Sequence, residues 1–144
     1  MQKELWRNRW LSCINELTSL ELQRKSWLDK SNTNPHWSFV EFMCSYFDDL
    51  GIDNNYKDLL NEGRISKKEF EIIQSWHRLL DKYKPPTGDD YDVKAILEDK
   101  DWQLIVEEGR KAKLDLVEIL SKEENQILME DIDYRKYKST DEKK

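Results

Sequence analysis

The sequence predicts an all-α fold, a single-domain bundle of about five to seven helices, and three observations lead to this prediction. Apolar residues recur at spacings of three and four along most of the 144 residues, as in helices with one buried face. Serine precedes glutamate by three residues where three of these patterns begin, as in a capping box. No strand-like alternation of useful length occurs. We expect one helical domain over residues 1–137 and a frayed charged tail over 138–144.

The first two helices follow from apolar stripes and from the residues that end them. We predict one helix over about 2–29 and a second over about 38–50. The stripe of the first comprises Trp6, Trp10, Cys13, Ile14, Leu17 and Leu20. Ser38 and Glu41 form the capping box of the second helix, and Gly51 can close it.

Two later helices begin at capping boxes. Ser66 and Glu69 start a helix that must end before Pro85, because a proline disfavours helical geometry in the residue before it. Ser121 and Glu124 start the last predicted helix.

The remaining elements are a short helix over 54–61, a turn of helix at 93–97 and a long helix over 102–119. Apolar residues in the long helix recur on average every 3.5 residues or so, which is typical of a seam packed along a neighbouring helix. Gly109 and Ala112 lie in this seam, so we expect the neighbour to approach closely there.

The composition indicates a very polar protein with an aromatic core. Hydrophobic residues make up 38% of the chain and charged residues another 38%, but 6 Trp, 6 Tyr and 4 Phe can supply large buried anchors. No apolar run is long enough to span a membrane. We therefore expect a cytoplasmic protein without membrane contact, in which Cys13 and Cys44 are buried free thiols.

The net charge of −6 is concentrated in one stretch. Residues 1–86 hold 13 acidic and 13 basic residues, residues 87–133 hold 15 and 6, and residues 134–144 hold 2 and 5. A protein that binds nucleic acid directly needs the opposite sign on its binding face, so the charge disfavours that function and favours a cationic partner.

The acidic run starts in the loop at 84–91, and its carboxylates face only Lys94 and Lys100 in the sequence. Its acids are Asp89, Asp90, Asp92, Glu98, Asp99, Asp101, Glu107 and Glu108. Such crowding is self-repulsive, and either a binding role or selection for a soluble surface accounts for it. Tyr91 and Trp102 are the aromatic anchors that we expect if the run binds a protein.

Asp48 and Asp49 form a second acidic feature, in the last turn of the second predicted helix. Carboxylates are unfavourable at this negative end of the helix dipole. Either an ion pair with an arginine of the first helix (Arg7, Arg9 or Arg24) or a cation of a partner would offset this effect.

No catalytic constellation emerges, so we do not expect an enzyme or a cofactor. The sequence lacks a glycine-rich phosphate loop, a nucleophile elbow and a cluster of Cys and His, and both His36 and His77 are typical of packing residues. The remaining enzyme hypothesis is a metal-dependent all-α nucleotide hydrolase. It would hold magnesium with Glu107, Glu108, Glu130 and Asp133, although Lys111 would compete with the metal.

Two segments resemble a known group of proteins. One segment runs from Trp37-Ser38-Phe39-Val40-Glu41-Phe42 into Tyr46-Phe47-Asp48-Asp49-Leu50, and the other contains Gly63-Arg64-Ile65-Ser66. With Ile96-Leu97, Asp99 and Trp102, they resemble the small acidic helical immunity proteins of bacterial polymorphic toxin systems, including contact-dependent growth inhibition. The likeness extends over most of residues 1–120.

The resemblance implies a cytosolic monomer that forms a heterodimer with one basic toxin domain, often a nuclease, and occludes its active site or substrate groove. No catalytic residue is implied, because such proteins act by occupancy. The expected partner-binding residues are Asp89, Asp90, Tyr91, Asp92, Glu98, Asp99 and Asp101, together with Asp48 and Asp49. The alternatives are the metal-dependent hydrolase and a helical adaptor or regulatory protein that binds a partner unrelated to toxins.

Overall fold

The structure is a computed structural model that describes residues 1–52 and 56–136, and these residues contain helices and no strand. The all-α prediction is confirmed, with eight α-helices in the described residues where five to seven were predicted. They are α1 (Lys3–Leu17), α2 (Leu20–Trp27), α3 (Phe39–Cys44), α4 (Lys57–Asn61), α5 (Lys67–Lys82), α6 (Val93–Glu98), α7 (Lys100–Val117) and α8 (Lys122–Leu128). A π-helical turn, η1 (Ser45–Asp49), follows α3, and a 3-10 turn, η2 (Tyr134–Lys136), follows α8. The predicted tail at 138–144 lies outside the described residues.

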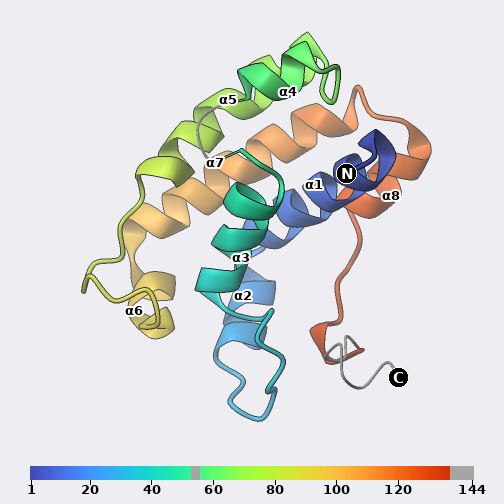
Figure 1. Cartoon of the computed structure of the whole chain (residues 1–144). Helices are drawn as coiled ribbons and strands as arrows, with labels where there is room; N and C mark the ends of the chain where they lie inside the picture. The colour runs from blue at the N-terminus through green and yellow to red at the C-terminus, as the bar shows by residue number, and fades with distance from the viewer. Residues whose placement is uncertain (53–55, 137–144) are drawn as a thin grey trace.

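The helices surround one hydrophobic core that is rich in aromatic side chains. α7 packs along α5 and crosses α1, while α8 packs on α1 (Figure 1). α2 and α3 extend to one side of this group, and α6 lies beside the start of α7 (Figure 1). The largest fully buried side chains are Trp10, Trp76, Trp102, Tyr46, Tyr56 and Phe42. These aromatic rings provide the large buried area that the sequence analysis expected from the aromatic residues.

The predicted first helix over 2–29 is wrong as a single element, because the chain forms two helices there. α1 ends at Leu17, and Ser19 caps α2 by accepting a hydrogen bond from the Leu22 backbone N–H. The Thr18 hydroxyl donates to the Ile14 carbonyl in the last turn of α1. Serine and threonine favour such side-chain bonds to the backbone at helix ends, and here they outweigh the continuous apolar spacing.

The second predicted helix is present but changes its winding. Ser38 accepts a hydrogen bond from the Glu41 backbone N–H and starts α3, which continues into η1. Gly51 then follows with a φ of 69°, the left-handed geometry that glycine adopts freely after a helix. The predicted helix over 54–61 is observed as α4 from residue 57, and residues 53–55 lie outside the described part of the chain.

α5 and α7 agree closely with the predicted pattern. The capping box at Ser66 and Glu69 is complete, since each residue's side chain bonds the backbone N–H of the other. In α7 the seam is buried up to Leu116, whereas Ile119 lies beyond the helix and is 39% exposed.

Gly109 is the point of closest approach in the α7 seam. A Cβ atom at this position would lie 2.6 Å from Trp76 Nε1 on α5 and 2.6 Å from Thr18 Cγ2. The prediction that small residues in this seam admit a close neighbour is therefore confirmed. Both cysteines are free thiols. Cys13 is buried as expected, but the expectation of burial is wrong for Cys44, which is only partly buried.

Candidate interaction surface

The candidate surface is built on the loop that follows α5 and on both ends of α6. Gly88 donates to the Pro85 carbonyl and has a φ of 76°, so the loop reverses direction through a conformation that favours glycine. Asp89 accepts from the Tyr91 backbone N–H at 2.9 Å, and this local turn directs the chain into α6. Ile96 and Leu97 then anchor α6 to the core, since both are buried.

Asp92 and Asp99 start two consecutive helices. Asp92 caps α6 by accepting from the Ala95 N–H, and Asp99 caps α7 by accepting from the Asp101 N–H. Asp99 also accepts a hydrogen bond of 2.8 Å from the Tyr83 hydroxyl. These carboxylates belong to the fold, because capping aspartates stabilise the positive end of a helix, and they still contribute negative charge to the surface.

Asp90, Glu98 and Asp101 have a different environment. All are exposed, and none forms an ion pair within the described part of the chain, although Lys94 and Lys100 lie among them in sequence. Beside them the Tyr91 side chain is 75% exposed. We name the acidic face the set Asp89, Asp90, Tyr91, Asp92, Glu98, Asp99 and Asp101.

Two parts of the predicted acidic run do not belong to this face. Glu107 and Glu108 pair with Arg110 and Lys111, one turn further along α7, so their charges are compensated within the chain. Trp102 is fully buried and donates to the Gln23 side chain at 2.9 Å. The expectation that Trp102 is an interface anchor is therefore wrong, because the period of α7 places it in the core.

Asp48 and Asp49 are exposed at the end of η1. The predicted internal ion pair with Arg7 is wrong, because the Arg7 guanidinium binds Glu69 and Glu124 instead. Within the described residues, Arg9 and Arg24 form no ion pair with Asp48 or Asp49 either. Burial and the neighbouring Asp48 carboxylate raise the pKa of the Cys44 thiol.

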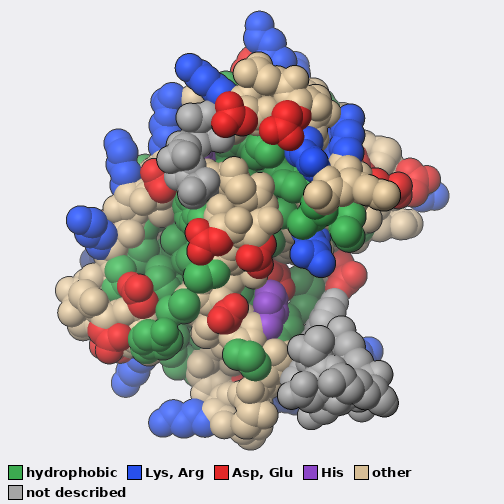
Figure 2. All heavy atoms as spheres, viewed as in Figure 1, with side chains coloured by type: hydrophobic (Ala, Val, Ile, Leu, Met, Phe, Trp, Pro, Cys, Tyr) green, Lys and Arg blue, Asp and Glu red, His purple; other side chains and the backbone are tan. Residues whose placement is uncertain are grey.

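Figure 2 shows how the acidic side chains are distributed on one face of the molecule. They occur over α6 and over α3 and η1, with hydrophobic and neutral side chains between these two groups, and others lie near α4 and on the side of α8. Lys and Arg side chains follow the edge formed by α5. The side of the molecule seen in Figure 2 thus combines separated negative groups with exposed apolar area.

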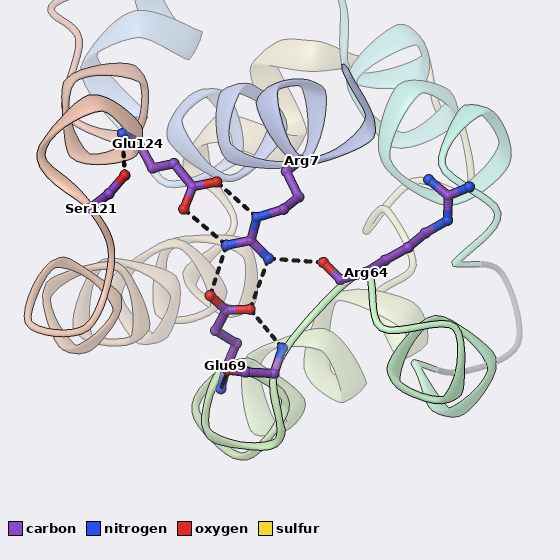
Figure 3. Close-up of polar contacts among 6 residues, drawn as sticks. Arg7, Arg64, Glu69, Ser121 and Glu124 are labelled. Carbon is purple, nitrogen blue, oxygen red and sulfur yellow. Dashed lines mark hydrogen bonds and ion pairs between the residues drawn. The ribbon is translucent and has the colours of Figure 1, made fainter. Parts of the chain in front are cut away.

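A partly buried ionic network that the sequence did not reveal lies at the start of α5, the end of that helix away from the acidic face (Figure 3). All five N–H donors of Arg7 are used. Nε and Nη2 donate to Glu124 at 2.7 and 3.0 Å, and Nη1 and Nη2 donate to Glu69 at 2.9 and 2.8 Å. Nη1 also donates to the Arg64 carbonyl at 2.8 Å. The network joins α1, α5 and α8. The sequence had indicated only Glu124, as the glutamate of the capping box that begins at Ser121, and not its ion pair with Arg7.

Both histidines belong to polar networks inside the fold. His77 Nδ1 lies 2.9 Å from the Tyr46 hydroxyl, which also bonds the Tyr56 hydroxyl, and burial lowers the pKa of His77. His36 Nε2 lies 2.7 Å from Glu16 Oε2. Burial opposes the charged form of His36, but the hydrogen bond and charge of Glu16 outweigh it and raise its pKa.

The described residues contain no group of three or more His, Cys, Asp or Glu side chains arranged to hold a metal ion. None of the helices in the described ranges combines the length and apolar character that crossing a membrane requires. Comparison of the chain with protein-family models, curated proteins and solved structures finds no match.

Proposed function

We propose that this chain is an immunity protein that binds a basic toxin domain in the cytoplasm through its acidic face and blocks the toxin's substrate groove. The observation that carries the proposal is the set of exposed carboxylates at Asp90, Glu98 and Asp101, which form no ion pair within the described residues. A nuclease is cationic where it holds phosphate, so exposed carboxylates on a binding partner compete for that place.

The geometry divides the acidic face into two kinds of residue. Asp92 and Asp99 fix the backbone by capping α6 and α7, so the face is rigid before binding and little ordering entropy is lost. Asp90, Glu98 and Asp101 are free to meet the partner's lysines and arginines. Charge complementarity of this kind mainly raises the association rate, up to roughly 10⁸–10⁹ M⁻¹s⁻¹ at low salt.

Tyr91 provides the apolar contact that such an interface needs. Tyr91 is 75% exposed, beside carboxylates and in a turn that its backbone N–H closes by donating to Asp89. Tyrosine is enriched among the residues that dominate binding energy, because it buries a large area at a small entropic cost. We therefore assign Tyr91 as the anchor, and Asp48 and Asp49 as a second contact group at the end of η1.

The alternative of a magnesium-dependent hydrolase has weaker support. Two of its four candidate ligands, Glu107 and Glu108, pair with Arg110 and Lys111 on the same helix. A helical adaptor needs the same kind of complementary surface as an immunity protein, so experiment must separate these two.

The test combines the products of the genes on either side of this chain's gene with two matched variants. The first variant is Asp90→Asn/Glu98→Gln/Asp101→Asn. The control variant is Glu71→Gln/Glu118→Gln/Glu123→Gln, which removes three exposed carboxylates from α5 and from the α7–α8 end of the molecule. Both variants change the net charge equally. Binding is measured at several salt concentrations, and survival of cells that produce the neighbouring protein is scored in parallel.

We expect one neighbouring product to be toxic, to bind the wild-type chain and the control variant, and to lose at least tenfold in affinity for the acidic-face variant at low salt. Cells should survive with the wild type and the control. A neighbour that binds without being toxic would overturn the immunity role in favour of an adaptor. Equal binding of all three proteins at every salt concentration would overturn the role of the acidic face.

A further inference from the structure

A groove in the described surface is lined by residues outside the acidic face. It has a volume of about 820 Å³ and runs between the end of α1, the start of α2, the second half of α7 and the segment 129–135. In Figure 1 this segment leaves α8 and passes beside α2 toward η2. Two hydrogen bonds fix it there, from Asn15 to the Glu130 carbonyl and from the Tyr134 hydroxyl to Asp29.

Lys113 on α7 lines this groove, and its ammonium bonds a neutral amide instead of a carboxylate. Its ammonium donates to Asn15 Oδ1 at 2.7 Å and forms no ion pair with a carboxylate of the described residues. An ammonium has three N–H donors, and Asn15 accepts only one of them. The Asn15 amide is held in place by its own bond to the Glu130 carbonyl, so the lysine is positioned rather than free to move.

Arg110 is the second cation of this wall. It lines the groove three residues before Lys113, a spacing that places two side chains on one side of a helix. Its pair with Glu107 is exposed and therefore weak. Burial and the charge of Arg110 lower the pKa of Lys113 to about 8. Two neighbouring cations at a groove wall repel each other, and an anion bound between them would offset this repulsion.

We infer that this groove binds a ligand through an oxyanion group, a carboxylate or a phosphate, which Lys113 and Arg110 hold together. The group accepts the free donors of the Lys113 ammonium and the guanidinium donors of Arg110 that its bond to Glu107 leaves free, and such donors suit an oxyanion. A volume of about 820 Å³ exceeds the size of one such group, so the rest of the ligand extends along the groove.

The other charged groups of the groove define where the oxyanion binds. Glu21 pairs with Lys25 on α2, and Asp133 accepts from the Arg135 backbone N–H. Glu130 and Asp131 lie on the segment 129–135, as Arg135 does. Because these carboxylates line α2 and the C-terminal segment, an anion is favoured only at the α7 wall, beside Lys113.

The experiment follows the lysine side-chain signals by NMR in the full chain labelled with ¹³C at lysine. Sulfate, which stands in for a phosphate group, and acetate are added at constant ionic strength against sodium chloride. Lys113→Gln assigns the signal and keeps a donor for Asn15. Lys111→Gln, at an exposed lysine of the same helix, is the matched control.

We expect sulfate, acetate or both to shift the Lys113 signal in a saturable way and to raise its pKa by about one unit or more. Their binding should be about five- to tenfold weaker at pH 9 than at pH 7. Arg110→Gln should weaken this binding and Lys111→Gln should preserve it. A response to sulfate alone assigns a phosphate ligand, and a response to acetate alone assigns a carboxylate. No response beyond that to chloride, or an equal loss in Lys111→Gln, would overturn the inference.

Discussion

Arg7 and Glu69 are joined by two parallel hydrogen bonds of 2.9 and 2.8 Å, which tie α1 to the first turn of α5. Both side chains are nearly buried, at 13% and 7% exposed. Breaking a buried ion pair from one side leaves an uncompensated charge and costs about 3–5 kcal/mol. Arg7→Met should lower the free energy of unfolding by about this amount, since it strands both Glu69 and Glu124.

Urea unfolding measures this effect. Lys25→Met breaks the exposed pair with Glu21 and should leave the unfolding midpoint almost unchanged. Adding Glu69→Gln and Glu124→Gln to Arg7→Met should recover part of the loss, because the stranded charges are then removed. Equal effects of Arg7→Met and Lys25→Met would refute a buried network.

Gly109→Ala should destabilise the protein although alanine is the better helix former. In an unhindered helix this change stabilises by about 1 kcal/mol. Here the new methyl group would meet the Trp76 indole and the Thr18 methyl group at 2.6 Å, and overpacking of this kind costs about 1–3 kcal/mol. Thermal unfolding gives the sign directly, with Lys111→Ala as an exposed control on α7. A higher melting temperature for Gly109→Ala would disprove the close packing of α7.

The buried Tyr46–His77 bond predicts stability that is lost on acidification. A consistent direction has the Tyr46 hydroxyl donating to Nδ1 of a neutral His77, and burial lowers the pKa of His77 below 6.5. The unfolded chain therefore binds a proton first as the pH falls. This contribution is complete above pH 6.5 and disappears as the pH falls through the folded pKa. His77→Gln should flatten the decline in unfolding free energy as the pH falls below about 6.5.

His36 should act in the opposite sense. Its pKa is raised above 6.5 because the bond and charge of Glu16 outweigh burial, so its contribution is complete below pH 6.5 and disappears as the pH rises through the folded pKa. NMR titration should find His36 above 6.5 and His77 below it. Glu16→Gln should bring the pKa of His36 down and leave that of His77 in place. A reversed order of the two values would contradict both assignments.

The sequence predicted what depends on local patterns and missed what depends on pairs distant in the chain. Capping residues such as Ser66 and the seam around Gly109 are local signals, and both predictions hold. The break after α1 was missed because apolar spacing continues through Thr18 and Ser19. Arg7 and Glu124 are 117 residues apart, and no periodicity relates them. Asp90 and Glu107 are both carboxylates of one acidic run in the sequence. Only the fold shows that Glu107 forms an ion pair with Arg110.

The most direct test of the proposed immunity function is the association rate of this chain with the neighbouring gene product that we propose as its toxin, measured by stopped flow as sodium chloride is raised. Exposed charges are screened beyond about 10 Å at 0.1 M salt, so the wild-type rate should fall steeply. The rate of Asp90→Asn/Glu98→Gln/Asp101→Asn should be at least tenfold lower at low salt and nearly flat. An acidic-face variant that associates as fast as the wild type, with the same salt dependence, would contradict the account.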